Sequence, residues 1–128
     1  MNGSTEARAL MDQWCKAFVA ADVEGVLSLY ASDAVFLGTS SPRMVSTSQQ
    51  VRTYFVGAMH ERKPQSAQVL ELQHQDFGNM AVITALDRIE WSAAAGPAVS
   101  MGRVTVLLQR VADAWQIVNF HRSEVPRV

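Results

Sequence analysis

The chain has 128 residues, of which 48% are hydrophobic and 18% are charged, and its formal net charge is −1. This length suits one domain over residues 1–128, and this balance is typical of a folded globular protein rather than a disordered chain. The lack of a basic excess argues against a nucleic-acid partner, and the lack of an apolar run of about 20 residues argues against a membrane span. The first six residues carry no signal-peptide pattern, so we expect a cytoplasmic protein.

The N-terminal segment is expected to form an amphipathic helix from about Ser4 to Ala21. Leu10, Trp14 and Phe18 recur at i, i+4 and i+8, the spacing that places side chains on one helical face. The single cysteine lies within this stretch, and we interpret it as a small core residue.

Two further helices and a short strand are expected before residue 66. Asp22 is placed to cap a helix over 23–30, and an apolar run over 34–38 predicts the first strand. Thr47 or Ser48 is placed to cap a third helix, which carries its own apolar stripe.

From residue 66 onward the apolar residues recur with a period of two, which is typical of strands. Tight-turn and hairpin signals separate four strand candidates, which span about 66–77, 80–92, 98–111 and 114–123. Helices followed by an antiparallel meander predict an α+β fold. We expect a curved sheet that wraps around the first helix and leaves a pocket.

The last of these strands has a readable alternation. It predicts one face with Trp115, Ile117 and Asn119, and an opposite face with Gln116, Val118 and Phe120. Arg122 follows this run of strand positions, which places it at the mouth of a cavity or inside one.

The string W-Q-I-V-N-F-H-R-S-E-V-P over 115–126 closely resembles the C-terminal strand of the association domain of calcium/calmodulin-dependent protein kinase II. That domain belongs to the nuclear transport factor 2-like (SnoaL-like) superfamily of cone-shaped α+β folds with a cystatin-like architecture. The segments 21–36 and 51–55 also look like the helix–helix–strand entry and the third helix of this family. The resemblance implies a cone in which N-terminal helices pack in a curved antiparallel sheet.

Two departures from the family pattern limit what the resemblance implies. Asn119 stands where the kinase hub typically has histidine, and the turn over 112–114 looks one residue shorter. The motifs of a kinase catalytic domain are absent from the sequence, so a kinase label does not transfer. The chain is more similar to small stand-alone members of the family, and the large rings of the kinase hub are not implied.

Three arginines on otherwise apolar strand alternations are candidate ligand-binding residues. Arg88, Arg103 and Arg122 would converge in the cone and bind a small carboxylate, as arginines in similar positions of the family suggest. The alternative is that they pair with Asp87, Glu90 or Glu124 at the strand ends, because an unpaired buried charge is strongly unfavourable.

Two aromatic residues complete the expected ligand site. Trp14 on the first helix is expected in the core or at the pocket, and Tyr54 on the third helix is a further candidate. Trp91 and Trp115 are interpreted as core or interface residues. The exposed sheet face predicts a homodimer, in agreement with the resemblance.

An enzymatic alternative remains open at this point. Isomerases, dehydratases and polyketide cyclases of the same superfamily place an acid–base residue in the cone. Asp87 and His121 are the candidates for catalysis here, although His121 is expected to point away from Arg122. The three histidines are scattered without a carboxylate cluster, and we expect neither a metal nor an organic cofactor.

Overall fold

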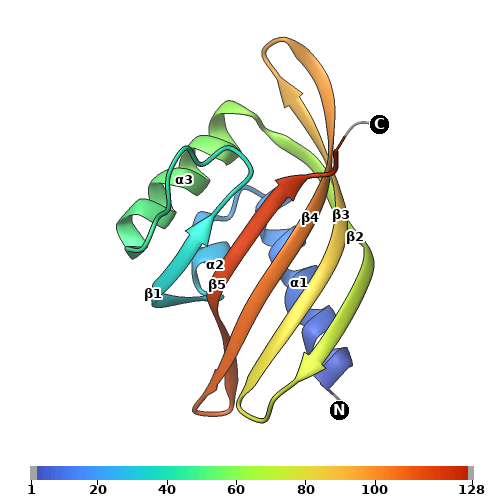
Figure 1. Ribbon diagram of the computed structural model, residues 1–128. Coiled ribbons are helices and arrows are strands. Elements are labelled where there is room, and N and C mark those ends of the chain that lie inside the picture. Colours follow the sequence, from blue (N-terminus) through green and yellow to red (C-terminus); the bar gives the residue numbers. More distant parts are fainter. Residues whose placement is uncertain (1–2, 127–128) are drawn as a thin grey trace.

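The computed structural model describes residues 3–126 (Figure 1). In chain order, its elements are α1 (Gly3–Val19), α2 (Val23–Leu27), β1 (Tyr30–Leu37), α3 (Ser48–Glu61), β2 (Pro64–Asp76), β3 (Met80–Ala93), β4 (Gly96–Val111) and β5 (Ala114–Glu124). Helices come first and a long antiparallel meander follows. The α+β prediction is therefore confirmed.

The five strands form one sheet in the order β1-β5-β4-β3-β2. β2 to β5 are antiparallel neighbours, whereas β1 pairs with β5 in parallel. The helices lie on one side of this sheet, with α1 packed across β2 and its neighbours (Figure 1). The opposite side, which we call the outer face, has no helix over it in the described residues.

Caps and turns appear where the sequence predicts them. The Asp22 side chain accepts a hydrogen bond of 2.9 Å from the backbone N–H of Gly25, and Thr47 accepts one of 3.2 Å from that of Gln50. The second helix is shorter than expected, because the chain enters β1 at Tyr30.

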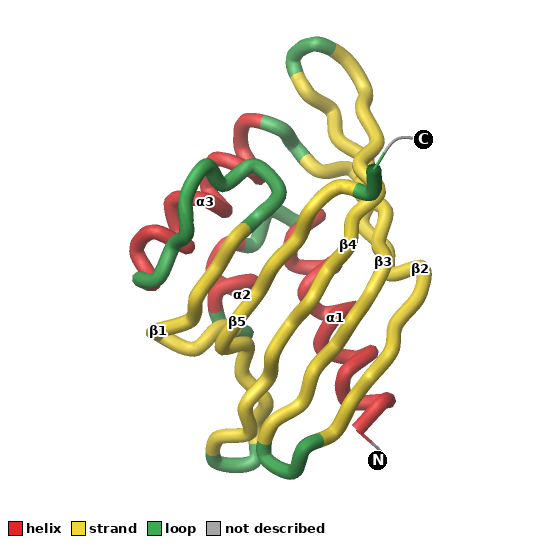
Figure 2. Tube along the Cα trace, in the orientation of Figure 1, coloured by secondary structure: helices red, strands yellow, loops and turns green. Residues whose placement is uncertain are grey.

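The two ends of the sheet differ in structure. Figure 2 shows the tight β2–β3 and β4–β5 turns at one end, and the β3–β4 hairpin tip with the loop after β1 at the other. We call the latter the open end. It brings together segments that are far apart in the sequence.

Several aromatic rings pack together in the core between helices and sheet. Trp14 stacks on Phe18 with ring centroids 4.8 Å apart and on Phe120 at 5.7 Å, and Phe36 stacks on Phe120 at 5.2 Å. Large flat side chains of this kind bury much apolar surface and lose little rotamer freedom. The rings form a wall that extends from α1 to the middle of β5.

The predicted alternation of β5 is wrong at one point. Its register shifts between Leu107 and Leu108 of β4, so that Leu107 pairs with Asn119 but Leu108 pairs with Ile117. This bulge inserts one extra residue into β5. Ile117 and Phe120 are therefore both buried on the inner face, although a regular strand would place them on opposite faces.

In the described part of the chain, no helix is both long and apolar enough to cross a membrane.

Candidate functional site

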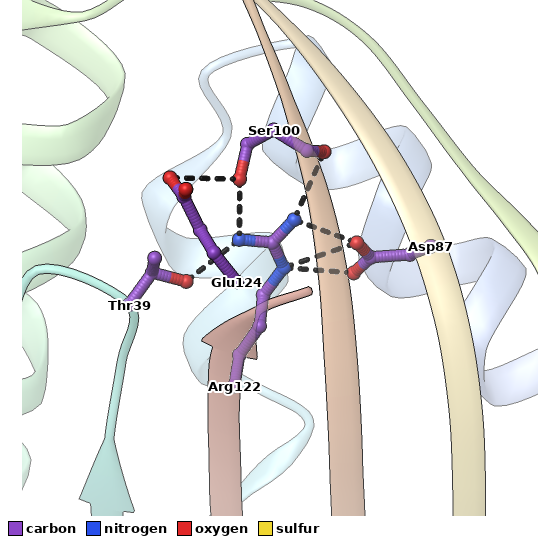
Figure 3. A network of polar contacts seen from close by, with 5 residues as sticks. All are labelled: Thr39, Asp87, Ser100, Arg122 and Glu124. Carbon is purple, nitrogen blue, oxygen red and sulfur yellow. Dashed lines mark hydrogen bonds and ion pairs between the residues drawn. The ribbon is translucent and has the colours of Figure 1, made fainter. Parts of the chain in front are cut away.

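Arg122 of β5 lies on the inner face of the sheet and is only 4% exposed. Its guanidinium forms a bidentate ion pair with Asp87 of β3, with Nη2 at 2.7 Å and Nε at 2.9 Å from the two carboxylate oxygens. Nη1 donates to the Thr39 hydroxyl at 2.6 Å and to the Ser100 hydroxyl at 3.1 Å (Figure 3). A buried guanidinium needs such a complete set of acceptors.

Gly102 of β4 makes this ion pair possible. It stands opposite Asp87 of β3 on one side and opposite Glu124 of β5 on the other, two residues beyond Arg122. A Cβ atom at this position would overlap the Arg122 guanidinium. Because glycine has no side chain, the Arg122 side chain can cross β4 at this position.

A cavity of about 270 Å³ lies beside the Arg122 network. Its walls are mainly aromatic and apolar, and its polar rim lies at the open end of the sheet. The lining residues are Trp14, Phe18, Phe36, Gly38, Thr39, Tyr54, Phe55, Arg62, Ile89, Trp91, Ala98, Val99, Ser100, Phe120, Arg122 and Glu124. Val99 is 53% exposed, so the cavity reaches the surface on this side.

The structure brings three of the five predicted ligand-binding residues to this cavity. Trp14, Tyr54 and Arg122 all line it. Trp14 reaches it from α1 and donates its indole N–H to the Tyr30 hydroxyl at 3.0 Å. Tyr54 reaches it from α3, where its ring packs against Phe36 with centroids 4.8 Å apart.

The other two arginines do not converge with Arg122, which corrects that expectation. Asp87 faces inward on β3, so the next residue, Arg88, faces outward, where it pairs with Glu90. Arg103 is exposed on the same outer face, opposite Leu86. Arg122 and Arg88 both pair with carboxylates of the protein, as the alternative prediction stated.

Neither predicted acid–base residue lines the cavity. Asp87 lies behind Arg122, and both of its carboxylate oxygens accept hydrogen bonds from that side chain. His121 is exposed on the outer face, opposite Thr105, as its position next to Arg122 requires. No group of three or more potential metal ligands occurs within residues 3–126.

Sequence reasoning did not assign four polar residues of this lining to the site, of which Glu124 was considered only as a pairing partner for an arginine. Ser100 shares the inward alternation of β4 with Gly102, a signal that could have identified it. Thr39 begins an irregular loop and Arg62 follows the end of α3, where periodicity gives no direction.

Two buried ionisable groups behind the aromatic wall remain in their neutral forms. Burial raises the pKa of the Cys15 thiol to about 12, and the nearby Asp87 carboxylate acts in the same direction. Burial also raises the pKa of the Tyr30 phenol above its ordinary value, against the opposing hydrogen bond from Trp14. Both groups are therefore uncharged near neutral pH.

A comparison with protein-family models shows the family to which the chain belongs. The model of the SnoaL-like domain matches residues 7–127. The chain belongs to this SnoaL-like family. The nuclear transport factor 2-like superfamily expected from the sequence is confirmed by the fold and by this match.

Solved structures agree with the family assignment. A protein from Xanthomonas campestris, provisionally named a calcium/calmodulin-dependent protein kinase II association domain, has a TM-score of 0.91 and 25% identity, over 100% of this chain and 91% of its own. A candidate aromatic ring hydroxylase from Novosphingobium aromaticivorans has a TM-score of 0.84 and 17% identity, over 94% and 87% of the two chains.

A candidate dehydratase from Streptomyces avermitilis has a TM-score of 0.79 and 16% identity, over 93% of this chain and 94% of its own. The two more distant structures show a shared fold and no more. A search of curated proteins finds no significant match.

Proposed function

We propose that this SnoaL-like protein binds a small organic molecule in the aromatic cavity and assembles with itself through the outer face of its sheet. The observation that carries the proposal is a cavity of about 270 Å³ that remains beside a fully hydrogen-bonded arginine. Ligand pockets span roughly 300–1,000 Å³, so a cavity of this size suits a compact ligand.

The walls favour a ligand with a flat, apolar body. Trp14, Phe18 and Trp91 present ring surfaces to the cavity, and Phe18 and Trp91 meet edge to face with centroids 5.5 Å apart. Such surfaces interact with another ring through burial and through offset or edge contacts. A benzene-sized ring with a short polar substituent matches this lining.

Arg122 supplies a polar wall rather than an unbalanced positive charge. Its ion pair with Asp87 neutralises the charge, and its N–H groups already have acceptors. The Thr39 hydroxyl accepts from Arg122 and keeps its own O–H, which can donate to an oxygen of the ligand. The anionic ligand that we expect therefore needs a second cation at the cavity.

Self-assembly is supported by the outer face. Leu86 and Met101 are 37% and 40% exposed on it, and they alternate with charged residues of both signs such as Arg103 and Glu90. A face with both signs of charge can be complementary to a second copy of itself around a two-fold axis. The name of the Xanthomonas campestris relative also points to association.

Binding is better supported than acid–base catalysis. The alternative of a cyclase, isomerase or dehydratase requires a base in the cavity, and both Asp87 and His121 lie outside its lining. The carboxylate in the lining, Glu124, accepts a hydrogen bond from Ser100, so the lining mainly offers positioning through ring contacts and hydrogen bonds.

The test is to fill the cavity. Ala98 lies on the inner side of β4 opposite Trp91, so Ala98→Trp would occupy the space beside the aromatic wall. Ala94→Trp, at the exposed hairpin tip, is the matched control. Calorimetric titration with benzyl alcohol, phenylacetamide and phenylacetate should show binding to the wild type and the control, and its loss in Ala98→Trp. Equal binding to all three proteins would contradict the proposal.

A further inference from the structure

Arg62 occupies a distinct position at the cavity. It is the C-cap residue of α3, it is half-buried, and it contributes to the cavity lining at the open end. Its guanidinium carbon lies 4.7 Å from the centroid of the Trp91 ring. This cation–π contact holds the charge beside the ring without using any of the five N–H donors.

Four of the eight arginines within residues 3–126 form an ion pair with a carboxylate of the protein. These pairs are Arg52 with Glu24, Arg88 with Glu90, Arg110 with Glu6 and Arg122 with Asp87. Within residues 3–126, the Arg62 guanidinium has only the contact with Trp91. It is therefore a cation at the cavity whose donors are available to a ligand.

We propose that Arg62 receives the carboxylate of the ligand, and that the ligand is a small aromatic monocarboxylate. This inference rests on the proposed function and adds the class of ligand. The planar guanidinium matches a carboxylate through two parallel hydrogen bonds. The ring of the ligand then lies against the aromatic wall that begins at Trp91.

The charges of the other lining residues fix the orientation. Glu124 of β5 also lines the cavity and accepts a hydrogen bond of 3.5 Å from Ser100, so it belongs to the side of the Arg122 network. A carboxylate on that side would meet a like charge, whereas one at Arg62 meets an opposite charge. The acid group therefore lies at Arg62, and the far end of the ring faces Arg122 and Thr39.

The test compares each acid with its neutral amide on the wild-type protein. Phenylacetate and benzoate are titrated calorimetrically beside phenylacetamide and benzamide, at low salt and pH 7. Hydrogen bonds to a charged partner contribute more than neutral ones, so we expect each acid to bind at least about 10-fold more tightly than its amide. Equal affinities, or a preference for the amides, would overturn the inference while leaving the proposed function standing.

Substitution then localises the preference. Arg62→Gln should reduce the affinity for the acids about 10-fold and leave that for the amides nearly unchanged, and Arg62→Lys should restore part of the loss because it keeps the charge. Arg103→Gln removes the same charge on the outer face and should change neither affinity. An acid preference that survives in both Arg62 variants would overturn the assignment.

The failures of the two proposals are distinguishable. If the neutral and acidic compounds all fail to bind, the cavity is not a ligand site and both proposals fall. If the neutral compounds bind and the acids bind no more tightly than the amides, only the assignment of Arg62 as the carboxylate-binding residue is wrong.

Discussion

At the scale of single residues, Arg122 lies on the inner face because every part of its side chain has a partner. The Asp87 carboxylate balances its charge, and two hydroxyl groups accept hydrogen bonds from Nη1. Gly102 leaves space for the guanidinium where it crosses β4. A buried ion pair contributes little net stability, but removing one partner leaves an uncompensated charge. The network therefore fixes the geometry of one wall of the cavity.

The first prediction concerns Asp87. The substitution Asp87→Asn leaves the Arg122 charge buried without a counter-charge, and we expect it to lower the free energy of unfolding by about 3–5 kcal/mol. Urea denaturation measures this loss. Glu90→Gln, an acid-to-amide change in the same strand at a half-exposed ion pair, should cost less than about 1 kcal/mol. Similar losses in the two variants would show that Arg122 is not stabilised by Asp87.

The second prediction concerns Cys15 and alkaline pH. Its pKa is about 12 in the folded protein against 9.0 for an ordinary thiol, so the unfolded chain loses this proton first as the pH rises. The contribution of Cys15 to stability is thus fully present below pH 9 and is lost between pH 9 and 12. In Cys15→Ala, the free energy of unfolding should fall less steeply over this window, by up to about 1.4 kcal/mol per pH unit.

The comparison of slopes isolates Cys15 from other groups that titrate in alkali. Parallel curves for the wild type and Cys15→Ala would contradict a buried, neutral thiol. Rapid labelling of native Cys15 by a thiol reagent at pH 8 would contradict it as well, because the thiolate is the reactive form.

At the scale of elements, the sequence predicted the order and type of nearly all helices and strands, because apolar periodicity and caps are local signals. The bulge of β5 could not be predicted in this way. It depends on the register against β4, which is set by long-range packing of Ile117 and Phe120 into the aromatic core. The alternation of β5 predicted the inward position of Arg122. The positions of Arg88 and Arg103 could not be predicted without knowing which face of the sheet the helices cover.

The third prediction concerns the β4–β5 turn. Ala112 has φ of 49° and Asp113 has φ of 66°, a left-handed pair that suits a two-residue hairpin turn but disfavours alanine. Ala112→Gly should raise the free energy of unfolding by about 1 kcal/mol, because glycine removes the Cβ strain. Ala114→Gly, at the start of β5, should instead lower it by about 0.5–1 kcal/mol. A loss of stability in both variants would exclude strain at Ala112.

At the scale of the whole molecule, the cone could be predicted from helices followed by a meander and from the resemblance of residues 115–126. The cavity could be predicted only in outline. Arg62 and Thr39 reach it from a helix end and a loop, and only the folded chain places these segments together at the open end of the sheet.

The fourth prediction concerns assembly. The chain mass is 14.1 kDa, and sedimentation velocity should give twice this value for the wild type. Met101→Glu places a charge in the middle of the outer face and should shift the protein to a monomer. Phe77→Glu, at the exposed β2–β3 turn away from the outer face, should leave the dimer intact. A monomeric wild type, or dissociation by both variants, would contradict assembly through this face.

The three tryptophans provide the most direct test of ligand binding. Trp14 and Trp91 line the cavity, whereas Trp115 lies outside it, stacked under Arg110 and hydrogen-bonded to Glu6. The measurement is the ¹H–¹⁵N spectrum of the indole N–H groups during titration with phenylacetate. Binding in the cavity predicts that the signals of Trp14 and Trp91 move with saturation while that of Trp115 stays. An unchanged spectrum, or movement of Trp115 alone, would contradict a ligand site in this cavity.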